Sequence, residues 1–161
     1  MKAKFIHKKD TTIYMFETDD AKLQKMYESN MNQLEQQRKN RINECAGELH
    51  YYKDGLRSVI RQREMLDEKY QSYTLIGRLI HYHSYRNQIS DYDREIQYNQ
   101  TKVNDWREEL WEQIHKPEDM NNIKHIIHKL LDNNHYRKLT EKTKSNGIIT
   151  EYWVKTKTRR L

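Results

Sequence analysis

The chain has 161 residues, of which 35% are hydrophobic and 34% are charged, and its formal net charge is +6. This composition excludes a large spherical core, because globular domains have about 45–50% apolar residues with Gly included. A coiled coil needs only about two apolar residues in seven, and one proline and four glycines favour long helices. Twelve tyrosines and three tryptophans argue against disorder.

The N-terminal sequence and the cysteine content lead us to expect a protein of a reducing compartment. Residues 1–20 lack the sustained apolar run of a signal peptide, and no apolar stretch approaches the length that spans a membrane. Cys45 is the single cysteine, so neither an internal disulfide nor a thiolate zinc cluster is expected. We therefore expect a cytoplasmic protein (host cytoplasm if it is viral) that makes no membrane contact.

The N-terminal segment 2–17 predicts a β-hairpin. β-branched and aromatic side chains flank a turn at residues 8–10, which favours strands on both sides of it. Residues 18–20, Thr-Asp-Asp, then provide an N-cap and first-turn acids for a helix.

Residues 20–70 predict one long helix with a heptad seam. The slip from Leu34 to Ile42, eight residues rather than seven, indicates a local change of winding. A turn at Asp54–Gly55 would instead give three helices, but the seam passes through it without a change of phase, which favours a continuous helix. The apolar heptad positions are Ile42, Leu49 and Leu56 in one set, and Cys45, Tyr52, Val59 and Leu66 in the other.

A second long helix ends near residue 115 and carries the clearest periodicity of the chain. Asn99 interrupts its seam, and a reversal between residues 71 and 82 gives an antiparallel helical hairpin. A helix that continued straight through would need a partner chain, so a homodimer is the alternative. The first heptad position of the seam is occupied by Tyr82, Ile89, Ile96, Val103 and Leu110. The second position, three residues later, is occupied by Tyr85, Tyr92 and Trp106.

Aliphatic side chains gather around Gly77, where the hairpin is expected to reverse. They lie out of phase with the seam, so we expect them at an exposed tip that contacts a protein partner. The predicted partner-binding residues are Leu75, Ile76, Leu79 and Ile80.

The C-terminal region predicts a short helix over residues 117–132, opened by Pro117, and two strands at 136–143 and 148–157. Asn146-Gly147 between the strands is a strong hairpin signal. The chain therefore predicts a mainly α, α+β fold, in which a coiled-coil arm projects from a small antiparallel sheet formed by both terminal hairpins and one short helix. The expected divisions are residues 1–19, 20–116 with its tip near 71–82, and 117–161.

The positive charge concentrates at the C-terminal end, where residues 135–161 carry a net +6, equal to that of the whole chain. A basic hairpin after a helix is the layout of a winged helix, whose wing contacts phosphates. The alternative is a solvated strand edge whose lysines prevent aggregation. The predicted nucleic-acid contacts are Lys142, Lys144, Lys155, Lys157, Arg159, Arg160, Lys124 and Lys129.

No catalytic motif is found, and we expect neither enzymatic activity nor a cofactor. His125 and His128 share a helix face, as metal ligands require, and His81 and His83 lie close in sequence. A zinc site needs three or four ligands, and no further cluster supports one, so we expect no metal site.

These patterns favour a non-enzymatic adaptor or inhibitor that binds a protein or nucleoprotein partner through the tip and the basic end. The layout resembles that of phage nuclease inhibitors that pair a coiled-coil arm with a small β-body, with which it shares no motif. The first alternative is a sequence-tolerant binder of DNA or RNA that uses its C-terminal hairpin, and the second is a structural subunit of a larger assembly.

Overall fold

The computed structural model describes residues 1–116 and 118–157. The chain divides into two compact units, one combining Met1–Gln37 with the C-terminal segment and the other being Arg38–His115. The mainly helical α+β class is confirmed. The elements in chain order are β1 (Lys2–Lys8), β2 (Tyr14–Thr18), α1 (Ala21–Gln71), α2 (Leu75–His115), α3 (Met120–Asn133), β3 (Tyr136–Thr143) and β4 (Ile148–Lys155).

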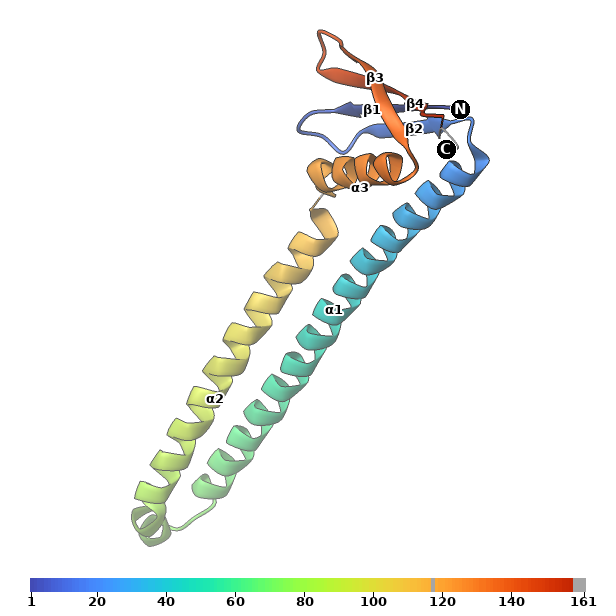
Figure 1. Ribbon diagram of the computed structural model, residues 1–161. Helices are drawn as coiled ribbons and strands as arrows, with labels where there is room; N and C mark the ends of the chain where they lie inside the picture. Colours follow the sequence, from blue (N-terminus) through green and yellow to red (C-terminus); the bar gives the residue numbers. More distant parts are fainter. Residues whose placement is uncertain (117, 158–161) are drawn as a thin grey trace. The chain divides into compact units, whose positions relative to one another are not determined.

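The four strands form one antiparallel sheet in the order β2-β1-β4-β3 (Figure 1). The predicted union of the two terminal hairpins is confirmed, because β1 pairs with β4 along its whole length. In this register Phe5 lies between Phe16 on β2 and Glu151 on β4. The first and last strands of the chain therefore form the centre of the sheet.

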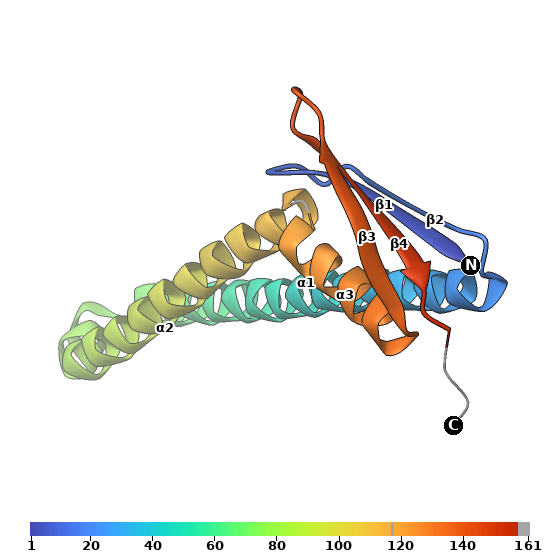
Figure 2. The same ribbon diagram turned by 45° about the horizontal axis from the view of Figure 1, so that its top comes forward.

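One face of this sheet is covered by helix, as the alternation of apolar residues along the strands requires. Helix α3 runs across that face, and the first turns of α1 pack into the same core (Figure 2). The N-cap of α3 is Asp119, whose carboxylate accepts from the Asn121 backbone N–H at 2.9 Å, while Pro117 lies outside the described residues. The core comprises Ala3, Phe5, Phe16, Leu23, Ile123, Ile127, Leu130, Leu131, Tyr136 and Trp153.

The predicted turn between β3 and β4 is confirmed. Gly147 has a φ of +80°, a left-handed conformation that favours glycine, and its N–H donates to the Lys144 carbonyl at 3.0 Å. The N-terminal hairpin differs slightly from prediction, since Ile13 lies outside β2 and is 67% exposed.

In the second unit α1 and α2 form the predicted antiparallel hairpin (Figure 1). The chain reverses at residues 72–74, between the two helices. Because α1 is continuous through Asp54 and Gly55, the alternative turn at these residues is wrong. Tyr82 was expected on the seam but is 52% exposed, because the seam of α2 begins one turn later, at Tyr85.

The hairpin seam follows the predicted heptads from both helices. Charged and aromatic pairs cross it: Arg63 Nε donates to Asp93 at 2.7 Å, and the rings of Tyr70 and Tyr85 stack 3.9 Å apart. The slip between Leu34 and Ile42 coincides with the boundary at which α1 passes from one compact unit to the other. The buried residues of the seam are Cys45, Leu49, Val59, Asn99 and Val103.

Candidate binding surfaces

The first candidate surface is the apolar start of α2, which we call the tip. It consists of the predicted residues Leu75, Ile76, Leu79 and Ile80, which are 79%, 71%, 79% and 71% exposed. Residues four apart are neighbours on a helix surface, and the two such pairs lie about 100° apart, so the four side chains form a broad patch on the start of α2. The structure thus brings together all four tip residues that the sequence singled out.

The tip is held in place by hydrogen bonds around the turn. Thr74 caps α2, accepting from the Gly77 N–H through its hydroxyl at 3.1 Å. Arg78 Nη2 donates to the Gln71 carbonyl at 2.7 Å, and the Tyr70 hydroxyl donates to the Arg78 carbonyl at 3.2 Å. The aliphatic side chains therefore stand on a fixed helix start.

The predicted nucleic-acid residues that lie within the described part of the chain do not assemble on one surface. Lys155 lies on the helix-covered side, where its Nζ donates to the buried Asp20 carboxylate at 3.1 Å. Lys124 lines a depression near the start of α3, and Lys129 lines a groove between α1 and α3. Lys157 is exposed beyond the end of β4, whereas Arg159 and Arg160 lie outside the described residues.

Asp20 shows why Lys155 has a structural role. This carboxylate caps α1, accepting from the Lys22 and Leu23 N–H groups, and also accepts from the Tyr136 hydroxyl at 2.9 Å. Burial by itself would raise the pKa of Asp20, but hydrogen bonds from Lys155, Tyr136 and the backbone lower it to about 2. Lys155 therefore ties β4 to the start of α1.

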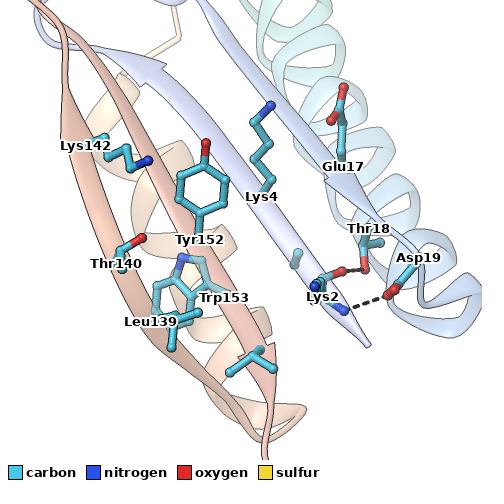
Figure 3. Close-up of a pocket in the computed structure, with 12 residues that line it drawn as sticks. Lys2, Lys4, Glu17, Thr18, Asp19, Leu139, Thr140, Lys142, Tyr152 and Trp153 are labelled. Atoms are coloured by element: carbon cyan, nitrogen blue, oxygen red, sulfur yellow. Dashed lines mark hydrogen bonds between the residues drawn. The ribbon is translucent and has the colours of Figure 1, made fainter.

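The second candidate surface is the sheet face opposite α3, which we call the open face (Figure 3). Strand residues alternate between the two faces, and those that point away from α3 line a depression of about 700 Å³. Basic side chains from two strands border it, and an aromatic ring lies between them (Figure 3). The principal side chains are Lys2, Lys4, Glu17, Leu139, Thr140, Lys142, Tyr152 and Val154.

A β-bulge widens the open face. Lys138 pairs with Trp153 and Thr140 pairs with Tyr152, so Leu139 is the extra residue of β3. Leu139 and Thr140 consequently both line the open face, and Leu139 is 61% exposed. Sequence periodicity could not reveal this, because a bulge shifts the alternation by one residue.

Tyr152 lies at the centre of the open face and is half-buried. The Lys142 ammonium lies over its ring, 5.7 Å from the centroid. At an exposed site such a contact contributes about 0.5–1 kcal/mol, so it orients Lys142 without fixing it. Of the predicted nucleic-acid residues that the structure describes, only Lys142 lines this surface, since Lys144 lies in the adjoining turn.

The covered face contains a buried carboxylate that the sequence analysis missed. Glu151 is 0% exposed, and its oxygens accept from His128 Nε2 at 2.6 Å, Lys138 Nζ at 3.1 Å and Trp153 Nε1 at 3.2 Å. His7 Nε2 lies 3.6 Å from the same carboxylate. The position of Glu151 between Ile149 and Trp153 on one strand face was the signal that could have found it.

The charge of Glu151 is stabilised by this shell. Burial by itself would raise its pKa, but the hydrogen bonds and charges of His128 and Lys138 outweigh burial and lower the pKa to about 2. Burial lowers the pKa of His7, so that imidazole favours its neutral form. Because Glu151 has no exposed surface, its arrangement suits fixing α3 to the sheet and not contact with a substrate.

The histidines considered as metal ligands and Cys45 form no further site among the residues that the structure describes. His125 and His128 were expected to share a helix face, but His128 bonds to the buried Glu151 whereas His125 is exposed. Within residues 1–116 and 118–157, no three His, Cys, Asp or Glu side chains are arranged to hold a metal ion. Burial raises the pKa of the Cys45 thiol.

No protein-family model matches the chain, and the searches of curated proteins and of solved structures find no significant match. None of the helices in the described part of the chain combines the length and apolar character needed to cross a bilayer.

Proposed function

We propose that this chain is a non-enzymatic binding protein, an adaptor or inhibitor that engages a protein partner through the tip of its helical hairpin. The observation that supports it is the patch of four aliphatic side chains, each more than 70% exposed. Contiguous exposed apolar surface on a soluble helix is typical of interaction sites. The reducing, cytoplasmic compartment expected from the single cysteine belongs to the same proposal.

The composition around the tip supports a protein interface. Residues 71–90 contain no acidic residue, while Tyr73, Tyr82, Arg78 and Arg86 surround the aliphatic patch in the sequence. Aromatic residues and arginine are enriched at the energetic centres of interfaces. The turn hydrogen bonds reduce the ordering that binding requires, which favours affinity.

The test is recovery of a partner by the immobilised protein from cells in which it occurs. In the double variant Leu75→Asp with Leu79→Asp, two charges would be buried at the interface, so a partner retained by the wild type should be lost. Circular dichroism should show an unchanged fold, because both side chains are already 79% exposed.

The matched control is Tyr51→Asp with Tyr98→Asp, two exposed positions on the same hairpin. This control should retain the partner. Equal recovery by the wild type and the tip variant would remove the tip from the proposal, and loss with the control alone would move the interface to the tyrosines.

A homodimer is the specific alternative for the same patch. A second copy at the tip would double the molar mass in light scattering from its monomer value of 19.9 kDa. Leu79→Asp would then restore the monomer. We propose a different protein as the partner, and therefore expect the monomer mass for wild type and variant alike.

A further inference from the structure

We propose that the open face of the sheet binds single-stranded nucleic acid, with Tyr152 as a stacking surface for a base and with Lys2, Lys4 and Lys142 as phosphate contacts. This site differs from the tip and does not depend on the protein partner proposed above. It shares Lys142 with the nucleic-acid contacts expected from the sequence, but its other residues, Lys2, Lys4 and Tyr152, were not among them.

The charge of the open face selects a polyanion. Lys2 and Lys4 come from β1 and Lys142 from β3, so the lysines border Tyr152 from two strands (Figure 3). The acids at this depression belong to its β2 edge: Glu17 lies opposite Lys4 in the register, and the Asp19 carboxylate accepts from the Lys2 backbone N–H at 2.7 Å. Away from that edge, the basic side chains of the depression therefore lie on β1 and β3, on either side of Tyr152 of β4.

The apolar part of the same face selects unpaired bases. Tyr152 presents an aromatic ring, with Leu139 and Val154 beside it, in an open depression of about 700 Å³. Bases of a single strand can stack on such a ring, whereas those of a duplex are already stacked on one another. A base on Tyr152 would displace the Lys142 ammonium from the ring toward the neighbouring phosphate.

The alternatives are less well matched. An acidic peptide would satisfy the lysines, but its Asp and Glu side chains carry no ring that could stack on Tyr152. A duplex would satisfy the lysines through its phosphates, yet it would gain nothing from the ring. Stacking together with a salt-dependent charge contribution is the combination that distinguishes a single strand.

The test is fluorescence anisotropy of the full chain with labelled 20-nucleotide oligouridine and oligothymidine. We expect both to bind, with a slope of log affinity against log salt of about −2, since each phosphate contact on a single strand contributes about −0.7. A duplex of the same length and polyglutamate should bind at least about tenfold more weakly. Equal or tighter binding of either would overturn the proposal in favour of a general polyanion surface.

The variants separate stacking from charge. Tyr152→Leu keeps an apolar side chain and should weaken oligouridine binding by at least about fivefold without changing the salt slope. The triple change Lys2→Glu, Lys4→Glu and Lys142→Glu should abolish binding. Glu17→Gln should strengthen it, because a negative charge beside the phosphates is removed.

The matched control is Lys22→Glu, Lys25→Glu and Lys69→Glu, three exposed lysines of α1 that do not line the open face. It makes the same change in net charge and should reduce affinity far less than the open-face triple variant. Equal losses in the two triple variants, or unchanged binding by Tyr152→Leu, would overturn the site. The tip variant should bind oligouridine like the wild type, so failure of either proposal leaves the other standing.

Discussion

Glu151 is a fully buried carboxylate on the covered side of the sheet. A buried carboxylate without partners would be neutralised, because desolvation is costly, but here His128, Lys138 and Trp153 all donate to it. These donors come from α3, β3 and β4, so one side chain connects three elements. Replacing one member of such a buried group leaves its partners without their hydrogen bonds or their counter-charge. The loss of folding stability is therefore larger than the net stabilisation by the intact group.

Glu151→Gln should therefore destabilise the protein by about 3 kcal/mol at pH 7. The pKa of Glu151 is about 2, against an ordinary value of 4.5, and each pKa unit corresponds to about 1.4 kcal/mol. Because the folded-state pKa is lowered, this stabilisation is complete above pH 4.5 and is lost as pH falls toward 2. Urea unfolding at a series of pH values measures it.

Glu141→Gln is the control for this prediction. Glu141 lies opposite Glu151 in the β3–β4 register and also pairs with Lys138, at 2.7 Å, but its side chain is 41% exposed. A surface ion pair contributes only about 0–1 kcal/mol, so this variant should differ little from wild type. If the two variants lose equal stability, or if the Glu151→Gln difference persists at pH 2, the assigned role of Glu151 is wrong.

At the scale of single residues the sequence could identify exposed groups better than buried partners. The tip aliphatics and Lys142 were recognised because their own neighbours along the chain defined them. Lys155 could not be separated from the other lysines, because its partner Asp20 is distant in sequence and meets it only through the β1–β4 pairing. Lys2, Lys4 and Tyr152 were missed for the same reason, since strand order decides which side chains share a face.

At the scale of elements the heptads predicted the helical hairpin well, because a repeated apolar seam is a local property of the sequence. They could not place the turn within the apolar segment after residue 71, where Leu75 and its neighbours are equally compatible with a helix or a loop. The structure shows that Thr74 decides it by capping α2. The space around each glycine of the hairpin predicts the effect of replacing it by alanine.

Gly47→Ala should stabilise the protein by about 1 kcal/mol and raise its melting temperature by a few degrees. Gly47 lies inside α1, where alanine is intrinsically favoured, and an added Cβ would meet nothing within 4 Å. Gly55→Ala should give a similar or slightly smaller gain, because its Cβ would lie at an ordinary 3.5 Å from Asn99 Oδ1. Thermal unfolding followed by circular dichroism measures both.

Gly77→Ala is the comparison that tests the geometric part of this argument. Its Cβ would approach the Tyr73 Cβ to 3.2 Å and the Thr74 Oγ1 to 3.3 Å, so strain in the turn should cancel the gain in helix propensity. We expect no increase in stability. An increase equal to that of Gly47→Ala would show that the turn is looser than its contacts indicate.

At the scale of the whole molecule, the two compact units differ in the sequence separation of the residues that contact one another within each unit. The hairpin brings together residues of adjacent helices, such as Arg63 and Asp93. The sheet instead joins the two ends of the chain, with Lys2 opposite Val154 and Lys8 opposite Ile148. Contacts between distant residues form late, because the intervening chain must first lose its freedom.

The hairpin should therefore fold first and promote formation of the sheet. Once α1 and α2 have paired, the Arg38 guanidinium lies 3.0 Å from the Ile114 carbonyl, so the chain that β1 and β4 must close is greatly shortened. Pulse-labelling hydrogen exchange with mass spectrometry should find amides near Val59 and Val103 protected before those of β1 and β4. A hairpin variant such as Val103→Ala, which leaves a cavity in the seam, should then slow formation of the sheet as well. Protection of β1 and β4 first, or a sheet that forms at an unchanged rate in this variant, would contradict this order.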